Sequence, residues 1–210
     1  MKRYFFTIDF LLPDSDPELL AGRSISVLHG FLIRRGLNGI GVSFPLWSQD
    51  SIGQAIGFTS TDAESLCSLC SQPYFESMSL NGFFNLSEVA PVPDGLGEVR
   101  FVRNQGIAKC FVGEQRRRLA RAKRRAEARG EVFDPKRLSF ERELEHFHRA
   151  VMYSQSKEQR FILHVQKEQA KEGAFSFEFN HYGLATKEQQ RGTVPELRSV
   201  ITQSLRENNK

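Results

Sequence analysis

The chain has 210 residues, of which 40% are hydrophobic and 26% are charged, and its formal net charge is +4. This length predicts one or two domains with a substantial core. No stretch approaches the roughly 18 apolar residues that a membrane span requires, and Asp9 interrupts the only candidate leader. Three cysteines, an odd number, favour a reducing compartment. We therefore expect a cytoplasmic protein with no membrane partner.

The first 93 residues alternate between segments typical of strands and of helices. Strands are expected at residues 4–11, 40–45, 55–60 and 83–90, and helices at residues 16–35 and 62–71. Asp16 before Pro17 is a helix start, and Thr61 with Glu64 predicts a capping box in which Thr61 is the cap. The order β-α-β-β-α-β predicts a ferredoxin-like domain, an arrangement that RNA-recognition modules also use.

The stretch 91–95 contains two prolines and a glycine, and it predicts a boundary between a domain of residues 1–93 and a C-terminal α+β domain of residues 94–210. In this second domain we expect strands at 99–103, 147–153, 160–165 and 175–179. Helices are expected at 114–129, near 139 and at 195–207. The last of these is amphipathic, and we expect it to dock on the body or to touch a partner protein. The fold class of the whole chain is thus α+β.

Residues 114–129 contain eight basic and two acidic residues, so this segment carries a net charge of +6 and leaves the remaining chain at −2. Seven of the eight basic residues are arginines, whose guanidinium groups suit phosphate oxygens and guanine edges. Three of them, Arg117, Arg121 and Arg125, share one helix face. A solvated helix with charged faces is the plainer interpretation, but such faces usually mix both signs. The segment predicts a nucleic-acid-binding helix, and charge alone does not distinguish DNA from RNA.

Candidate catalytic side chains are few. His29 lies on the first helix and could take or give a proton, although a lone helical histidine is more often structural. Ser154 lies between two strands in what could be an ordinary polar turn. Cys67 and Cys70 have the spacing of a zinc pair, but four ligands are needed, so we expect two small buried residues instead. The sequence also has no carboxylate cluster for Mg²⁺ and no phosphate-binding glycine loop, so no metal or cofactor is expected.

Several motifs occur together in one order and spacing. They are Val27-Leu28-His29 followed after ten residues by Ile40-Gly41-Val42-Ser43-Phe44-Pro45; Arg103-Asn104-Gln105; Arg116-Arg117-Arg118-Leu119-Ala120-Arg121; Ser154-Gln155-Ser156 with Phe161; and Tyr182-Gly183-Leu184. Over residues 1–186 the chain resembles the type I-F CRISPR repeat-processing endoribonucleases, the Cas-six-f or Csy-four family. It looks closest to the branch from transposon-encoded RNA-guided systems. It departs from the family at Ala122-Lys123, at Ala185 and in a longer tail.

The resemblance implies a metal-independent endoribonuclease that cuts a CRISPR repeat hairpin at its 3′ base, leaves a 2′,3′-cyclic phosphate and a 5′-hydroxyl, and keeps the hairpin. His29 would transfer the proton, Ser154 would position the ribose and Tyr182 would orient the imidazole. The implied RNA-binding residues are Arg103, Gln105, Arg116, Arg117, Arg118, Arg121, Arg124, Arg125, Ser156 and Phe161. Implied partners are the repeat RNA, type I-F Cascade backbone subunits and a TniQ-like transposition adaptor. The alternatives are a non-catalytic hairpin-binding scaffold and, more weakly, a DNA-binding regulator.

Overall fold

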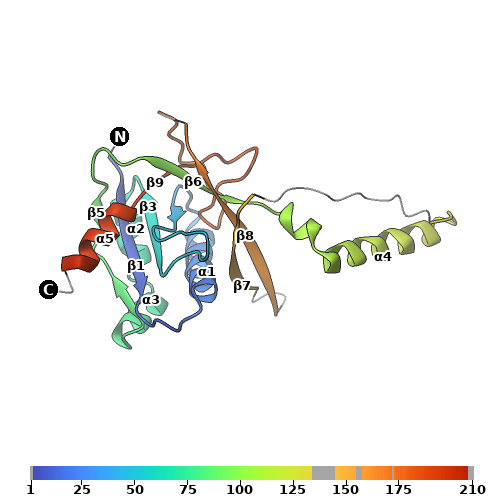
Figure 1. Cartoon of the computed structure of the whole chain (residues 1–210), viewed down its shortest axis with the longest axis horizontal. Helices are drawn as coiled ribbons and strands as arrows, with labels where there is room; N and C mark the ends of the chain where they lie inside the picture. Colours follow the sequence, from blue (N-terminus) through green and yellow to red (C-terminus); the bar gives the residue numbers. More distant parts are fainter. Residues whose placement is uncertain (1, 134–144, 155–157, 172, 208–210) are drawn as a thin grey trace.

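The computed structural model describes residues 2–133, 145–154, 158–171 and 173–207 (Figure 1). In chain order the elements are β1 (Tyr4–Phe10), α1 (Pro17–Arg35), β2 (Gly41–Ser43), β3 (Ala55–Ser60), α2 (Ala63–Cys70), α3 (Pro73–Leu80), β4 (Phe84–Leu86), β5 (Ala90–Pro91), β6 (Glu98–Arg103), the short 3-10 helix η1 (Ile107–Cys110), α4 (Val112–Ala128), β7 (His148–Ser154), β8 (Gln159–Gln169), β9 (Val194–Pro195) and α5 (Arg198–Glu207). Helices and antiparallel sheets together confirm the α+β class.

The first sheet has the strand order β2-β3-β1-β4, all neighbours are antiparallel, and β5 also pairs with β1. Phe6 and Ile8 share one face of β1, are fully buried and lie opposite Phe58 and Ile56 of β3. The Phe6 and Phe58 rings stack with centroids 5.0 Å apart. The succession of β1, α1, β2, β3, α2 and β4 confirms the order expected for this half of the chain.

Local capping explains where α1 begins and ends. The Asp16 carboxylate accepts hydrogen bonds from the amides of Glu18 and Leu19, at 2.9 and 3.1 Å, and Gly36 closes the helix with a φ of 63°. The predicted bounds of this helix are therefore confirmed. They matter for function because they fix the position of His29 on the helix surface.

The predicted cap of α2 was wrong. Asp62, not Thr61, caps the helix, and its carboxylate accepts from the amides of Glu64 and Ser65 at 3.0 and 3.3 Å. A carboxylate one residue later satisfies the exposed amides and complements the helix dipole, so Thr61 falls outside the helix.

The two cysteines of α2 are less buried than the sequence predicted. Cys67 is exposed and Cys70 is half-buried, which contradicts the expectation that both are buried.

The second sheet has the order β7-β8-β6-β9. β8 is longer than predicted and reaches Gln169, because its far half pairs with β6. Residues 175–179 belong to neither sheet, although the carbonyls of Ser176 and Glu178 accept from the amides of Thr193 and Gly192. The helix predicted near residue 139 lies outside the described residues.

α1 lies against both sheets, and its closest approach is to β7 (Figure 1). At Gly22 a Cβ atom would be 2.0 Å from the carbonyl oxygen of Val151, so only glycine allows this contact. A single buried apolar cluster includes side chains from both sheets, such as Phe6 from the first and Phe101 from the second. The boundary after residue 93 stays a prediction.

The two remaining long segments behave differently. α4 projects away from the body, and Leu119 is 38% exposed while Ala126 is buried, so the helix makes little apolar contact (Figure 1). It begins two residues before the predicted start. By contrast, the start of the C-terminal segment docks, because Leu197 and Ile201 are buried. Within the described residues, no helix has both the length and the apolarity to cross a bilayer.

Candidate functional site

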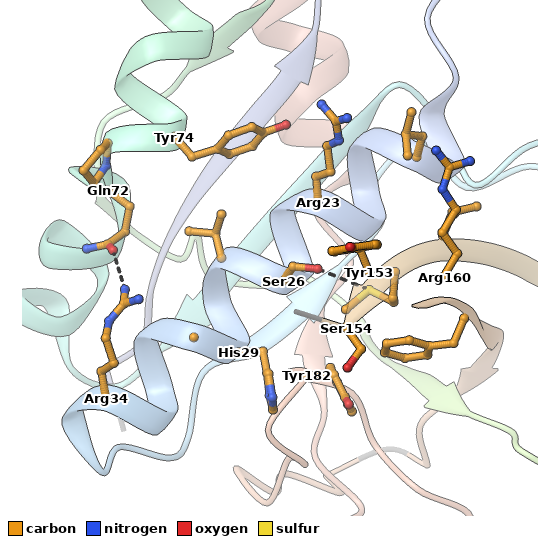
Figure 2. Close-up of a pocket in the computed structure, with 17 residues that line it drawn as sticks. Arg23, Ser26, His29, Arg34, Gln72, Tyr74, Tyr153, Ser154, Arg160 and Tyr182 are labelled. Carbon is orange, nitrogen blue, oxygen red and sulfur yellow. Dashed lines mark hydrogen bonds between the residues drawn. The ribbon is translucent and has the colours of Figure 1, made fainter. Parts of the chain in front are cut away.

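A cleft of about 710 Å³ opens beside α1, between the ends of β7 and β8, the start of α3 and the turn around Tyr182 (Figure 2). Its described lining comprises Leu19, Arg23, Ser26, Val27, His29, Gly30, Arg34, Gln72, Pro73, Tyr74, Val151, Met152, Tyr153, Ser154, Arg160, Phe161 and Tyr182. His29, Ser154, Phe161 and Tyr182, which the sequence motifs singled out, thus come together from four separate segments.

His29 is held by a carbonyl group and by an aromatic ring. Its Nδ1 lies 3.1 Å from the carbonyl oxygen of His181. A carbonyl oxygen only accepts, so Nδ1 carries a proton and the neutral imidazole keeps its lone pair on Nε2. The Tyr182 ring stacks on the imidazole, with centroids 4.7 Å apart and an interplanar angle of 18°. These contacts define both the tautomer and the plane of the ring.

A tight turn at residues 180–184 holds Tyr182 in this position. The Asn180 side chain accepts hydrogen bonds from the amides of Tyr182 and Leu184, at 2.8 and 3.3 Å. Gly183 has a φ of +71°, and its carbonyl accepts from the Val42 amide at 2.7 Å. A Cβ atom at this position would be 2.6 Å from Val42 and 2.8 Å from Leu28. The glycine therefore lets the turn press against β2 and α1.

Arg103 extends the aromatic stack. Its guanidinium carbon lies 4.9 Å from the centroid of the Tyr182 ring, within cation–π range. Its Nε is buried and makes no hydrogen bond with the described residues. Burial lowers the pKa of the Arg103 guanidinium, and Tyr182 partly offsets this effect. The side chain still carries its charge, so a half-buried cationic group lies against the Tyr182 ring.

Ser154 and Phe161 form the opposite wall. Ser154 ends β7 and pairs with Gln159 of β8, while the Phe161 ring meets Tyr182 edge-on at 6.5 Å. Ser156 lies outside the described residues. Gln105 is exposed in the turn after β6. Asn104 shapes this turn, since its side chain accepts from the Gly106 amide at 2.9 Å and donates to Gln166 at 2.7 Å.

The arginines of α4 stand apart from the cleft. The structure places Arg116, Arg117, Arg118, Arg121, Arg124 and Arg125 on the exposed surface of this projecting helix. The Nε of Arg121 donates to the carbonyl of Arg117 at 3.3 Å, and Lys123 pairs with Glu127 at 3.8 Å. The helix therefore presents a cationic surface to solvent, as the sequence predicted.

In the part of the chain that the structure describes, no group of three or more histidine, cysteine or acidic side chains is close enough to hold a metal ion. The nearest approach to a cluster is His146 with His148, whose Nε2 atoms are 3.1 Å apart. His148 also donates to the carbonyl of Ser48, at 2.9 Å. Both rings pack on Trp47, His148 buried and His146 exposed, and neither residue lines the cleft.

Sequence reasoning missed two groups of the site. Asn180 and the carbonyl of His181 hold Tyr182 and His29, and the signal was the Asn-x-Tyr-Gly pattern, in which asparagine and glycine are typical turn residues. The sequence also gave no sign that Arg23, Arg34 and Tyr74 would line the same cleft.

Comparison with known proteins agrees with this arrangement. No curated protein matches the chain. A family model described as CRISPR-associated protein (Cas_Csy4) matches residues 7–197, which include every one of the candidate site residues. Because the match covers most of the chain, the protein belongs to the Cas_Csy4 family, the Csy4-type endoribonucleases that process CRISPR precursor RNA.

Proposed function

We propose that this protein binds the hairpin of a CRISPR repeat RNA and cuts the strand at the 3′ base of the stem without a metal ion. The observation that carries the proposal is the state of His29. Its Nδ1 donates to a backbone carbonyl, so Nε2 is left to act on substrate in the same cleft as Ser154.

The proposed reaction needs one base and one aligned ribose. The 2′-oxygen upstream of the cut attacks the adjacent phosphorus while Nε2 of His29 takes the hydroxyl proton. The bond from phosphorus to the 5′-oxygen breaks, and that oxygen takes up a proton from solvent water. The products are a 2′,3′-cyclic phosphate and a 5′-hydroxyl. In this scheme Ser154 positions the ribose for in-line attack, and Tyr182 holds the imidazole plane.

The other site residues would hold the foot of the stem. Phe161 stacks on the terminal base pair, since an aromatic ring can bind any base face. Arg103 and Gln105 read base edges, because guanidinium and amide groups donate to the acceptors that bases present. Ser156, two positions after Ser154 in the sequence, is assigned a further RNA contact.

The arginines of α4 would bind the stem itself. A helix that projects from the body with a cationic surface can lie along a groove, where it neutralises phosphates and releases counterions. Contacts of this kind form equally with substrate and product, so the protein keeps the cut hairpin. Retention would make it a subunit of a type I-F Cascade complex, with Cascade backbone subunits and a TniQ-like adaptor as partners.

One assay tests the proposal. The repeat RNA hairpin is incubated with protein in EDTA, and the ends of the products are analysed. We expect cleavage with a cyclic phosphate terminus for the wild type, and a loss of about 10² to 10⁴-fold in rate for His29→Ala with binding retained. His146→Ala removes another exposed imidazole and serves as the matched control. Binding without cleavage by the wild type would instead identify a hairpin-binding scaffold.

A further inference from the structure

The cleft does not end at His29. It continues across the exposed face of α1 to the start of α3, where Arg23 and Arg34 of α1 face Gln72 and Tyr74 (Figure 2). None of these four residues belongs to the catalytic group or to the stem-binding set. The cleft therefore has a second arm that the cutting reaction itself leaves unused.

The second arm is cationic. No described lining residue of the cleft carries a carboxylate, and neither Arg23 nor Arg34 forms an ion pair with a described residue. The Arg34 guanidinium donates to the side-chain oxygen of Gln72 at 3.1 Å, and Gln72 in turn donates to the Ser68 carbonyl at 3.0 Å. This neutral partner orients the guanidinium and leaves its charge for an anion.

Tyr74 supplies a polar group to the same arm. Its hydroxyl is buried, and burial raises the pKa of the phenol while the neighbouring Arg23 guanidinium opposes this shift. The ring is fixed by Phe75 and Phe84, with centroids 5.8 and 5.9 Å away. Figure 2 shows the hydroxyl turned toward the side of Arg23. The Tyr74 hydroxyl therefore helps to hold the Arg23 guanidinium in this arm of the cleft.

The floor between the two arms is made of small residues. Gly30 follows His29 directly, and a Cβ atom added there would have only Arg34 near it, at 3.5 Å. Ser26, one turn earlier, donates its hydroxyl to the Gly22 carbonyl at 2.9 Å and so stays close to the helix. A polymer backbone can therefore cross α1 at this point without meeting a bulky side chain.

We propose that the second arm binds the single-stranded RNA on the 3′ side of the cut. The stem and its 5′ product are held by α4, Arg103 and Phe161 on the side of β6 and β8, so the strand beyond the scissile phosphate leaves in the other direction, across Gly30. Arg23 and Arg34 bind its phosphates, and Tyr74 and Gln72 hold the two guanidinium groups in place. This inference rests on the proposed function, since His29 marks the cut.

The test compares tail lengths on an RNA that binds but is not cut. The probe is the repeat hairpin with a 2′-deoxy ribose at the cut, followed by either one nucleotide or about eight nucleotides, a length within the range of known single-strand sites. We expect the long tail to bind the wild type about five- to tenfold more tightly at low salt. If two phosphates are bound, the tail adds about 1.4 to the salt slope of binding.

Variants show whether the second arm causes this gain. We expect the double variant Arg23→Gln, Arg34→Gln to lose the gain and the added slope while its affinity for the short tail is unchanged. Arg35→Gln removes a charge from the next position of α1, where the guanidinium covers Phe31 instead of the cleft, and it should retain the gain.

Two results would overturn the inference: equal affinity of the wild type for both tails, or a gain that the double variant keeps. Neither outcome touches the proposed function, which is tested separately by cleavage of the all-ribose RNA with the short tail. A wild type that fails to cut this RNA refutes the proposed function, whatever the tails show.

Discussion

The Tyr182 ring lies nearly parallel to the imidazole of His29, with 4.7 Å between centroids and 18° between planes. Among the described residues, the imidazole is held by this stacking and by the hydrogen bond from Nδ1 to the His181 carbonyl, so Tyr182 orients it through its ring. We expect Tyr182→Phe to cleave within about threefold of the wild-type rate, because the ring remains. Tyr182→Leu should cleave about 2- to 12-fold more slowly, because it loses the stabilisation of about 0.5–1.5 kcal/mol that an aromatic pair provides. Single-turnover rates at saturating protein measure both, and a Phe variant as slow as the Leu variant would assign the role to the hydroxyl.

Gly183 should tolerate no side chain. Its φ is +71°, and a Cβ atom would meet Val42 and Leu28 at 2.6 and 2.8 Å. We expect Gly183→Ala to lower the free energy of unfolding by about 2–4 kcal/mol and to slow cleavage, since Tyr182 moves with the turn. Urea denaturation measures the first effect. Gly95→Ala is the control, because Gly95 has a φ of +80° with no atom within 4 Å, so only the backbone cost of about 1 kcal/mol applies.

Substitution of Arg121 tests whether α4 contacts the phosphates of the RNA hairpin. We expect Arg121→Ala to weaken hairpin binding and to lower the slope of log affinity against log salt by about 1, as for one lost phosphate contact. Lys123→Ala is the matched control, because Glu127 already compensates that charge. A slope unchanged in Arg121→Ala would mean that this side chain does not reach phosphate.

Two substitutions show whether Asp62 or Thr61 caps the N-terminus of α2. We expect Asp62→Ala to lower the free energy of unfolding by about 1 kcal/mol, because the amides of Glu64 and Ser65 lose their acceptor. Thr61→Ala should change it by less than about 0.5 kcal/mol, the usual range for surface positions. Denaturation at pH 7 compares the two, and equal losses would restore Thr61 as a capping residue.

Two buried histidines should make stability depend on pH. Burial lowers the pKa of His148, with Ser48 opposing the shift and His146 adding to it, and burial also lowers the pKa of His164. Below the ordinary histidine pKa, the unfolded chain then binds more protons than the native one. We expect the free energy of unfolding to be highest above that value and to fall as the pH drops toward 5. His148→Gln, whose amide can still donate to Ser48, should flatten this decline, and an identical pH profile would exclude His148 as its source.

The sequence by itself determined the elements whose signals are local. Alternation gave β1, and Asp16 with Gly36 marks both ends of α1, since hydrogen bonds within a few residues set these features. The charge of α4 is likewise a property of one contiguous segment. Local signals gave the wrong residue where two neighbours could both cap a helix, as Thr61 and Asp62 could for α2. The sequence analysis also did not predict α3, although Pro73 lies in its first turn.

Only the tertiary structure decided how distant segments meet. Arg103, Tyr182 and His29 come from β6, a turn near the end of the chain and α1, and their stacking depends on the contact that Gly183 allows with Val42 and Leu28. The second arm of the cleft depends in the same way on α3 packing beside α1, which brings Gln72 to Arg34. Such contacts arise from side-chain packing between elements far apart in sequence, and no periodicity or spacing along the chain encodes their distances.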